Sequence, residues 1–98
     1  MSLGNTKGMN ITEAKRLFEL NDLNKALEIL NPLISEDSAD IEFLLLRGRI
    51  YYKMQRWGDA MNDYVAVLEI EPKNHEAKVG LDMAKSILGY FTPDMFNP

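Results

Sequence analysis

Apolar residues recur at every third or fourth position in several stretches of the chain, which is the spacing of amphipathic helices. The strongest pattern fills residues 41–74, where two apolar stripes flank a short break at Gln55 and Arg56. Pro72 cannot continue a helix and closes this segment. Similar stripes occupy residues 10–40, and one further stripe lies near the carboxyl end. The pattern predicts an all-α domain of about five helices, folded as antiparallel pairs.

Polar residues suggest where the first two helices begin and end. Asn10 can cap the first helix, and Glu13 three residues later can reach back to the cap amide. Pro32 falls within the second apolar stripe, where proline removes a backbone donor and clashes with the preceding turn. We expect this helix to end near Asn31 and to continue as a short turn through Ile34.

The later helices carry their own start and stop signals. Residues 35–40 form an acidic loop, in which Ser38 or Asp40 is expected to cap the third helix. Asn74 is expected to cap a fifth helix, which Gly89 would end.

Small residues mark the expected contacts between paired helices. Gly48 lies inside a helix, where glycine costs about 1 kcal/mol relative to alanine, so we expect another helix to come close there. Ala60 is the matching small residue on the next helix. The same size pattern occurs earlier in the chain at one constant interval: Ala14 with Gly48, Leu17 with Tyr51, Ala26 with Ala60, Leu30 with Tyr64, and Leu33 with Val67.

This interval, about 34 residues, is the period of the tetratricopeptide repeat, a helix–turn–helix unit. The signature of that family resembles the series Gly48, Tyr51, Ala60, Tyr64 and Pro72, with Ala14 and Ala26 as earlier counterparts. The resemblance implies a short right-handed solenoid of two repeats closed by a capping helix. The expected segments are a disordered start that is partly a tag remnant (1–9), a degenerate repeat (10–40), a second repeat (41–74), a capping helix (75–89) and an aromatic tail (90–98).

Two finer expectations concern individual contacts. Arg47 stands where the family prefers leucine, and we expect it to pair with Glu13, its counterpart one repeat earlier. The tail is too apolar for an idle linker, and we expect it to turn back near Pro93 and cover the last helix. Docking on a second copy and disorder are the alternatives. The helix residues to be covered are Val79, Met83 and Ile87.

The resemblance also implies a binding surface, because the first helix of each pair in this family lines a concave groove that receives an extended peptide. The residues carried over are Lys15, Phe18, Glu42, Leu45, Arg49, Tyr52 and Lys53. The family's carboxylate clamp is missing, since Ile11, Leu45, Lys15 and Arg49 occupy its places. Stacked cations and rings would suit an acidic ligand with an apolar or aromatic residue. Alternatively, these are ordinary solvated side chains.

Composition argues against several other functions. A net charge of −4 and a pI near 4.9 do not suit a nucleic-acid partner, although a basic-aromatic run lies at residues 47–57. No apolar run is long enough to cross a membrane, and the chain has no cysteine. No signal peptide is recognisable, which favours the cytoplasm.

Catalytic motifs are also missing from the sequence. His75 and Glu76 begin like a zinc-protease motif, but Val79 stands where its second histidine must be. The acidic residues of 36–42 lack the spacing of a calcium loop. We therefore expect no enzyme, cofactor or metal site, and a monomeric module that binds a protein or peptide. The alternative is a self-associating subunit, such as a homodimer.

Overall fold

The computed structural model describes residues 6–34 and 40–91, with side chains over 10–34 and 40–89. Within these segments every regular element is helical and no strand occurs. The elements are α1 (Thr6–Glu19), α2 (Leu23–Leu30), the 3₁₀ turn η2 (Asn31–Leu33), α3 (Ile41–Lys53), α4 (Trp57–Ile70) and α5 (His75–Phe91). The predicted all-α class is confirmed.

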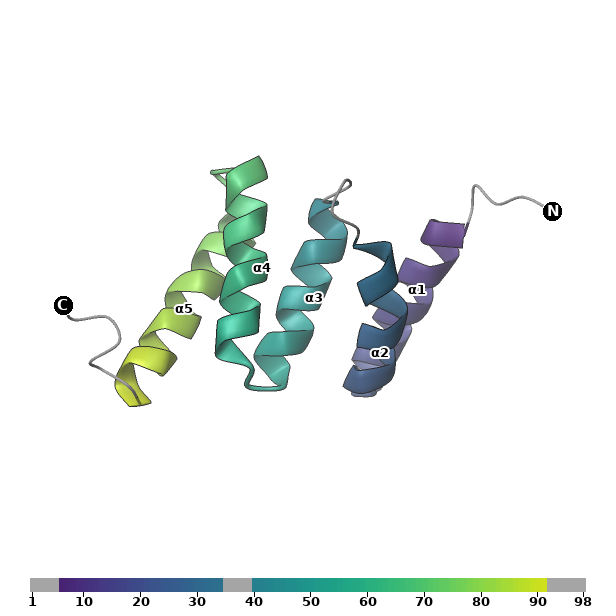
Figure 1. Ribbon diagram of the computed structural model, residues 1–98, viewed down its shortest axis with the longest axis horizontal. Coiled ribbons are helices and arrows are strands. Elements are labelled where there is room, and N and C mark those ends of the chain that lie inside the picture. Colours follow the sequence, from purple (N-terminus) through teal and green to yellow (C-terminus); the bar gives the residue numbers. More distant parts are fainter. Residues whose placement is uncertain (1–5, 35–39, 92–98) are drawn as a thin grey trace.

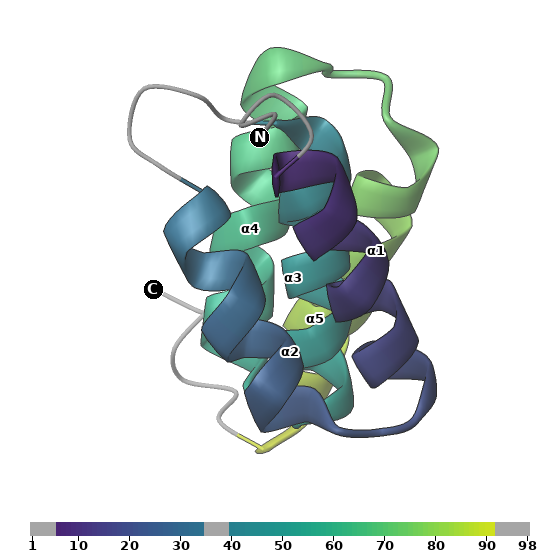
Figure 2. The ribbon, with the colours of Figure 1, turned by 90° about the vertical axis from the view of Figure 1, so that its right-hand side faces the viewer.

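The helices stand side by side in chain order and form an elongated body with extents of 55 × 28 × 21 Å (Figure 1). Viewed along the row, α1, α3 and α5 form one layer, while α2 and α4 form the other (Figure 2). Each helix packs against its neighbour in sequence, as in a short solenoid. One layer therefore consists of the first helix of each pair.

The two predicted breaks within the helix pairs have the same structure. Asn21 and Gln55, which occupy equivalent positions in the two repeats, both adopt a left-handed conformation with φ of 63°. In both turns the next residue donates its amide to the carbonyl five residues back, at 2.8 Å. This is the Schellman closure of a helix end, normally built on glycine or asparagine. The chain therefore reverses in the same way in both repeats.

Two apolar clusters form the core, and α3 contributes to both. The first cluster joins α1, α2 and η2 to α3, and its buried members are Ile11, Ala14, Leu17, Ala26, Leu27, Leu30, Leu33, Phe43, Leu46 and Ile50. The second joins α3 to α4 and α5 through Leu44, Ala60, Tyr64, Val67, Ala77 and Leu81. Since α3 is buried on both sides, it links the two repeats into one body.

The close approach at Gly48 involves a different partner from the predicted one. A β-carbon at Gly48 would lie 2.9 Å from Cε1 of the Tyr64 ring, and one at Gly80 would lie 2.6 Å from Cε2. The ring is therefore held between glycines of α3 and α5. Ala60 is fully buried in the same cluster, but Gly48 is small because an aromatic side chain, rather than another small residue, faces it.

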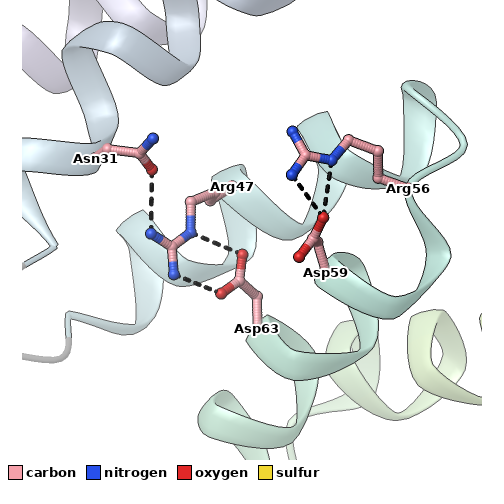
Figure 3. A network of polar contacts seen from close by, with 5 residues as sticks. All are labelled: Asn31, Arg47, Arg56, Asp59 and Asp63. Atoms are coloured by element: carbon pink, nitrogen blue, oxygen red, sulfur yellow. Dashed lines mark hydrogen bonds and ion pairs between the residues drawn. The ribbon is translucent and has the colours of Figure 1, made fainter.

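The predicted pairing of Arg47 with Glu13 is wrong. Arg47 instead donates two hydrogen bonds to the Asp63 carboxylate, at 2.9 and 2.7 Å, and a third to Asn31 Oδ1 at 3.1 Å (Figure 3). Glu13 binds Arg16 one turn further along its own helix. Asp63 is 3% exposed, and this burial raises the pKa of its carboxyl. The hydrogen bonds to Asp63 raise the pKa of Arg47. One guanidinium thus connects α2, α3 and α4.

The predicted start of the first helix is also wrong. The helix begins at Thr6, so Asn10 lies in its interior and cannot cap it, and residues 6–9, expected to be disordered, are helical. No proline interrupts this stretch, and each added helical residue gains a backbone hydrogen bond once the helix exists. Residues 1–5 lie outside the described segments.

The last helix continues past its predicted stop. α5 runs through Gly89 to Phe91, and no glycine in the described segments has positive φ. A glycine ends a helix by adopting the left-handed conformation, and Gly89 does not do so. The first two residues of the expected tail are therefore helical. The predicted turn and docking of the tail fall on residues 92–98, outside the described segments.

The other boundary signals were interpreted correctly. Asp40 accepts a 3.0 Å hydrogen bond from the Glu42 amide, and Asn74 accepts one of 2.9 Å from the Ala77 amide. The helix before Pro32 ends at Leu30 and continues as the 3₁₀ turn. The alternative cap at Ser38 lies outside the described segments.

Candidate binding groove

A groove of about 660 Å³ lies along α1, α3 and α5, the helices of one layer. Four elements line it: α1 with one residue, α3 with three, α4 with Tyr64 and α5 with five. Its lining residues are Phe18, Arg49, Tyr52, Lys53, Tyr64, His75, Glu76, Val79, Gly80 and Met83. Carbon atoms dominate this lining, so the groove is an apolar surface with a few charged groups.

The centre of the groove depends on Tyr64. This side chain is only 3% exposed, and burial raises the pKa of its hydroxyl to about 12. Gly80 has no side chain, so the ring from α4 can reach the groove layer. Beside it, Val79 and Met83 are 40% and 50% exposed. The wall on α5 therefore offers apolar surface that no described part of the chain covers.

An ion pair joins α3 to α5 across the groove. Two guanidinium nitrogens of Arg49 on α3 donate to the Glu76 carboxylate on α5, Nη2 to Oε1 at 2.6 Å and Nε to Oε2. These hydrogen bonds raise the pKa of Arg49. Both side chains are about 40% exposed, so solvent screens the pair and its net contribution to stability is small. Its geometry nevertheless fixes the charge of Arg49 against the protein's own carboxylate.

The end of the groove near α1 carries a cation over a ring. The Lys53 ammonium lies 5.3 Å from the centre of the Phe18 ring, which is a cation–π contact between the repeats. Tyr52 packs edge-on against Trp57, with ring centres 5.0 Å apart. Aromatic rings from both repeats therefore border the groove.

The structure brings together part of the predicted groove set. Phe18, Arg49, Tyr52 and Lys53 line the groove. Outside its lining, Lys15 and Glu42 bind each other at 3.4 Å, and Leu45 packs against the second core cluster.

The whole α5 wall was missed as a groove surface, although the sequence contained a signal for it. Val79 and Met83 lie one repeat period after Leu45 and Arg49, two residues of the predicted groove set. Continuing the same period into α5 would have placed both on the groove. They were instead assigned to a face that the tail would cover.

In residues 6–34 and 40–91, no three histidine, cysteine or acidic side chains gather as a metal site would require. His75 lines the groove, but the aliphatic Val79 occupies the place of the second histidine of the zinc motif. No described helix is both long and apolar enough to cross a bilayer.

Known proteins resemble the chain over most of its length. DnaJ protein P58IPK homolog B of Oryza sativa is 30% identical over 78 residues, covering 80% of this chain and 17% of that protein. Superkiller protein 3 of Saccharomyces cerevisiae is 28% identical over 95 residues, covering 85% and 7%. The DnaJ homolog subfamily C member 7 homolog of Dictyostelium discoideum is 28% identical over 79 residues, covering 81% and 15%.

The chain thus spans less than a fifth of the length of these relatives. No solved structure matches it significantly. The family model for the tetratricopeptide repeat matches residues 41–74, the segment that holds α3, α4 and the turn before α5. With this match in register with the helix pair, the chain is a tetratricopeptide-repeat protein.

Proposed function

We propose that this chain is a non-enzymatic protein–protein interaction module that binds a peptide or protein segment in the groove over α1, α3 and α5. The observation that carries the proposal is the apolar wall on α5. Val79 and Met83 are 40% and 50% exposed there, beside the buried ring of Tyr64. Exposed apolar surface gathered in a concavity is typical of ligand and partner sites.

The family supports the same class of function. Tetratricopeptide repeats in general bind proteins and do not catalyse reactions, and residues 41–74 are such a repeat. The groove also has the mixed make-up of a partner site, since aromatic rings and an arginine border it. Those residue types are enriched where proteins contact one another.

The proposal predicts that the groove wall and an equally exposed surface elsewhere respond differently to mutation. One variant carries Val79→Ser with Met83→Ser in the groove. Its matched control carries Val65→Ser with Ile70→Ser on α4, where the side chains are 43% and 48% exposed and do not line the groove. Partners captured from cell extract by the wild type would be identified, and their affinity for each variant would be measured by titration.

We expect the groove variant to bind at least tenfold more weakly, because each large apolar side chain buried in a complex contributes roughly 1.5–3 kcal/mol. The control variant should bind as the wild type does. If the partner's affinity falls for the control variant but is unchanged for the groove variant, the binding surface lies outside the groove.

Sedimentation velocity on the same proteins tests the oligomeric state. We expect a monomer at all concentrations for the wild type and both variants. A dimer that the groove variant abolishes would mean that the groove holds a second copy of the chain.

A further inference from the structure

The groove contains two cations with different surroundings. Arg49 donates two hydrogen bonds, from Nε and Nη2, to the Glu76 carboxylate. Lys53, by contrast, has no carboxylate within ion-pair distance in the segments 6–34 and 40–91, and its ammonium rests on the Phe18 ring. With His75 neutral, the lining carries a net charge of +1, although the whole chain carries −4. The groove is thus locally positive on an acidic protein.

We propose that the groove recognises a segment of a partner that carries one acidic side chain next to large apolar ones. This inference rests on the proposed function and specifies its ligand. Lys53 receives the carboxylate, while Val79 and Met83 receive the apolar side chains. The ligand is an internal protein segment whose charge comes from aspartate or glutamate.

The other two cations of the predicted groove set, Lys15 and Arg49, are less suited to receive that carboxylate. Lys15 binds Glu42 at 3.4 Å, and Arg49 is held bidentately by Glu76. A ligand carboxylate would have to displace an acid of the protein from either one. A net gain therefore requires a cation without a carboxylate partner, and among the described residues that line the groove Lys53 meets this condition.

Moving Lys53 also exposes further binding surface. Its contact with Phe18 is an exposed cation–π contact, which is weak and can be exchanged for an ion pair. When the ammonium turns to a ligand, the face of the Phe18 ring becomes free for an apolar side chain. The acidic and apolar parts of the ligand would therefore support each other.

The size of the groove limits what enters it. A volume of about 660 Å³ lies within the roughly 300–1,000 Å³ of ordinary ligand pockets, so it accepts a few side chains. The chain's own residues 94–96 are Asp, Met and Phe, which have the same chemistry as the proposed ligand. Binding by that segment is therefore a competing outcome that the experiment must separate.

The test begins with a phage-displayed library of random linear peptides selected on the full chain. We expect the enriched sequences to share one aspartate or glutamate beside two large apolar residues. An enriched peptide is then titrated against the wild type by fluorescence anisotropy, together with a version in which lysine replaces its acid. Binding of the acidic peptide should weaken as salt is added, because exposed charges are screened.

Charge reversal identifies the receptor of the carboxylate. Lys53→Glu should weaken the acidic peptide about five- to tenfold and strengthen the lysine version, as expected when an exposed pair becomes a repulsion. The control is Lys78→Glu, which makes the same charge change at an exposed position on α5 that does not line the groove. It should change either affinity less than twofold.

Three results would overturn the inference. In the first, no peptide is enriched, or the enriched peptides carry no acid. In the second, Lys53→Glu has no more effect than Lys78→Glu. In the third, Met95→Ser with Phe96→Ser in the full chain raises peptide affinity more than tenfold, which would make the chain's own segment the occupant.

The second result leaves the proposed function open to its own test. If peptide affinity still falls with Val79→Ser and Met83→Ser, the proposed function survives. If those changes also have no effect, it fails as well.

Discussion

The two repeats fill the same places with different chemistry. Where the first repeat has Ala14 and Leu30, both buried in an aliphatic cluster, the second has Gly48 and the ring of Tyr64. Asp63 of the second repeat is the counterpart of Ile29, a half-buried aliphatic residue. At these places the first repeat is held by aliphatic packing. The other adds an aromatic ring seated on glycines and a buried ion pair.

The difference shows where geometry matters most in this molecule. An aliphatic contact tolerates small shifts, whereas a bidentate ion pair and a ring between two backbones accept a narrow range of positions. The more specific contacts all involve the second repeat. Arg47 connects it to Asn31 of the first pair, and Tyr64 reaches Gly80 of α5. The second repeat therefore positions both neighbours and, with them, both walls of the groove.

The largest expected effect comes from breaking the ion pair. Asp63→Ala should lower the free energy of unfolding by about 3 kcal/mol, because it leaves the half-buried Arg47 without its carboxylate. The change would be measured by urea denaturation followed by circular dichroism. Glu13→Ala is the comparison in the first repeat. It removes an exposed pair with Arg16 and should change the free energy of unfolding far less than Asp63→Ala does, because solvent screens that pair.

A double variant tests whether the second repeat could use the chemistry of the first. Arg47→Leu with Asp63→Ile introduces the aliphatic residue found at position 29 and the leucine preferred by the family. Buried ion pairs can often be replaced by apolar residues at little cost, so most of the stability lost in Asp63→Ala should return. If the double variant is no more stable than Asp63→Ala, the two repeats are not interchangeable at this place.

The sequence specified the helices well because their ends depend on local chemistry. Asp40 and Asn74 accept amide hydrogen bonds at helix starts, and these can be predicted from residue type and spacing. The start that failed was decided by competition. Asn10 can cap a helix, but continuing the helix upstream to Thr6 gains more backbone hydrogen bonds. Residue type alone does not decide between these outcomes.

Contacts between helices were predicted less well, for a different reason. The size pattern showed that something must approach Gly48, but it did not say from which direction. Likewise, the family resemblance marked Arg47 as unusual, because leucine is preferred there, but its carboxylate partner is Asp63 on the next helix and not Glu13 of the previous repeat. The α5 wall of the groove was predictable from the repeat period, because Val79 and Met83 repeat earlier groove positions. The repeat period therefore predicts which helix layer a residue belongs to. The residue that it contacts depends on the direction of its side chain, which the period does not give.

The pH dependence of stability sharpens the comparison further, since Leu30 does not titrate and Tyr64 does. The pKa of Tyr64 is raised from 10.0 to about 12, chiefly by burial. A raised pKa favours folding while the tyrosine is protonated in both states, and this contribution is lost as pH rises from about 10 to about 12. At about 1.36 kcal/mol per unit, the loss approaches about 2 kcal/mol near pH 12.

Tyr64→Phe isolates this contribution from those of the other titrating groups. The difference in unfolding free energy between wild type and Tyr64→Phe should be constant at neutral pH and shift by about 2 kcal/mol against the wild type between pH 10 and 12. Urea unfolding at fixed pH values would measure it. If the unfolding free energies of the two proteins instead change in parallel between pH 10 and 12, the Tyr64 hydroxyl is as well solvated in the folded chain as in the unfolded one.

The smallest expected effect concerns the glycines around the ring. A methyl group at Gly80 would press on two ring atoms at 2.6 Å, which costs about 1–3 kcal/mol, while the better helix propensity of alanine returns up to about 1 kcal/mol. We therefore expect Gly80→Ala to lower stability by about 1 kcal/mol in a thermal melt. Gly58→Ala is the control, since nothing lies within 4 Å of its β-carbon position. It should be neutral or slightly stabilising.

The cause of the Gly80→Ala loss can be separated from backbone effects by changing the ring. Combined with Tyr64→Leu, which introduces the residue found at position 30, Gly80→Ala should cost less than it does alone, because the shorter side chain does not reach the new methyl group. The ring also contacts Gly48, so it cannot move freely away from α5. If Gly80→Ala costs the same with Tyr64 or leucine present, the glycine is required by the helix backbone and not by the ring. The contrast between an aliphatic and an aromatic repeat would then rest on the ion pair alone.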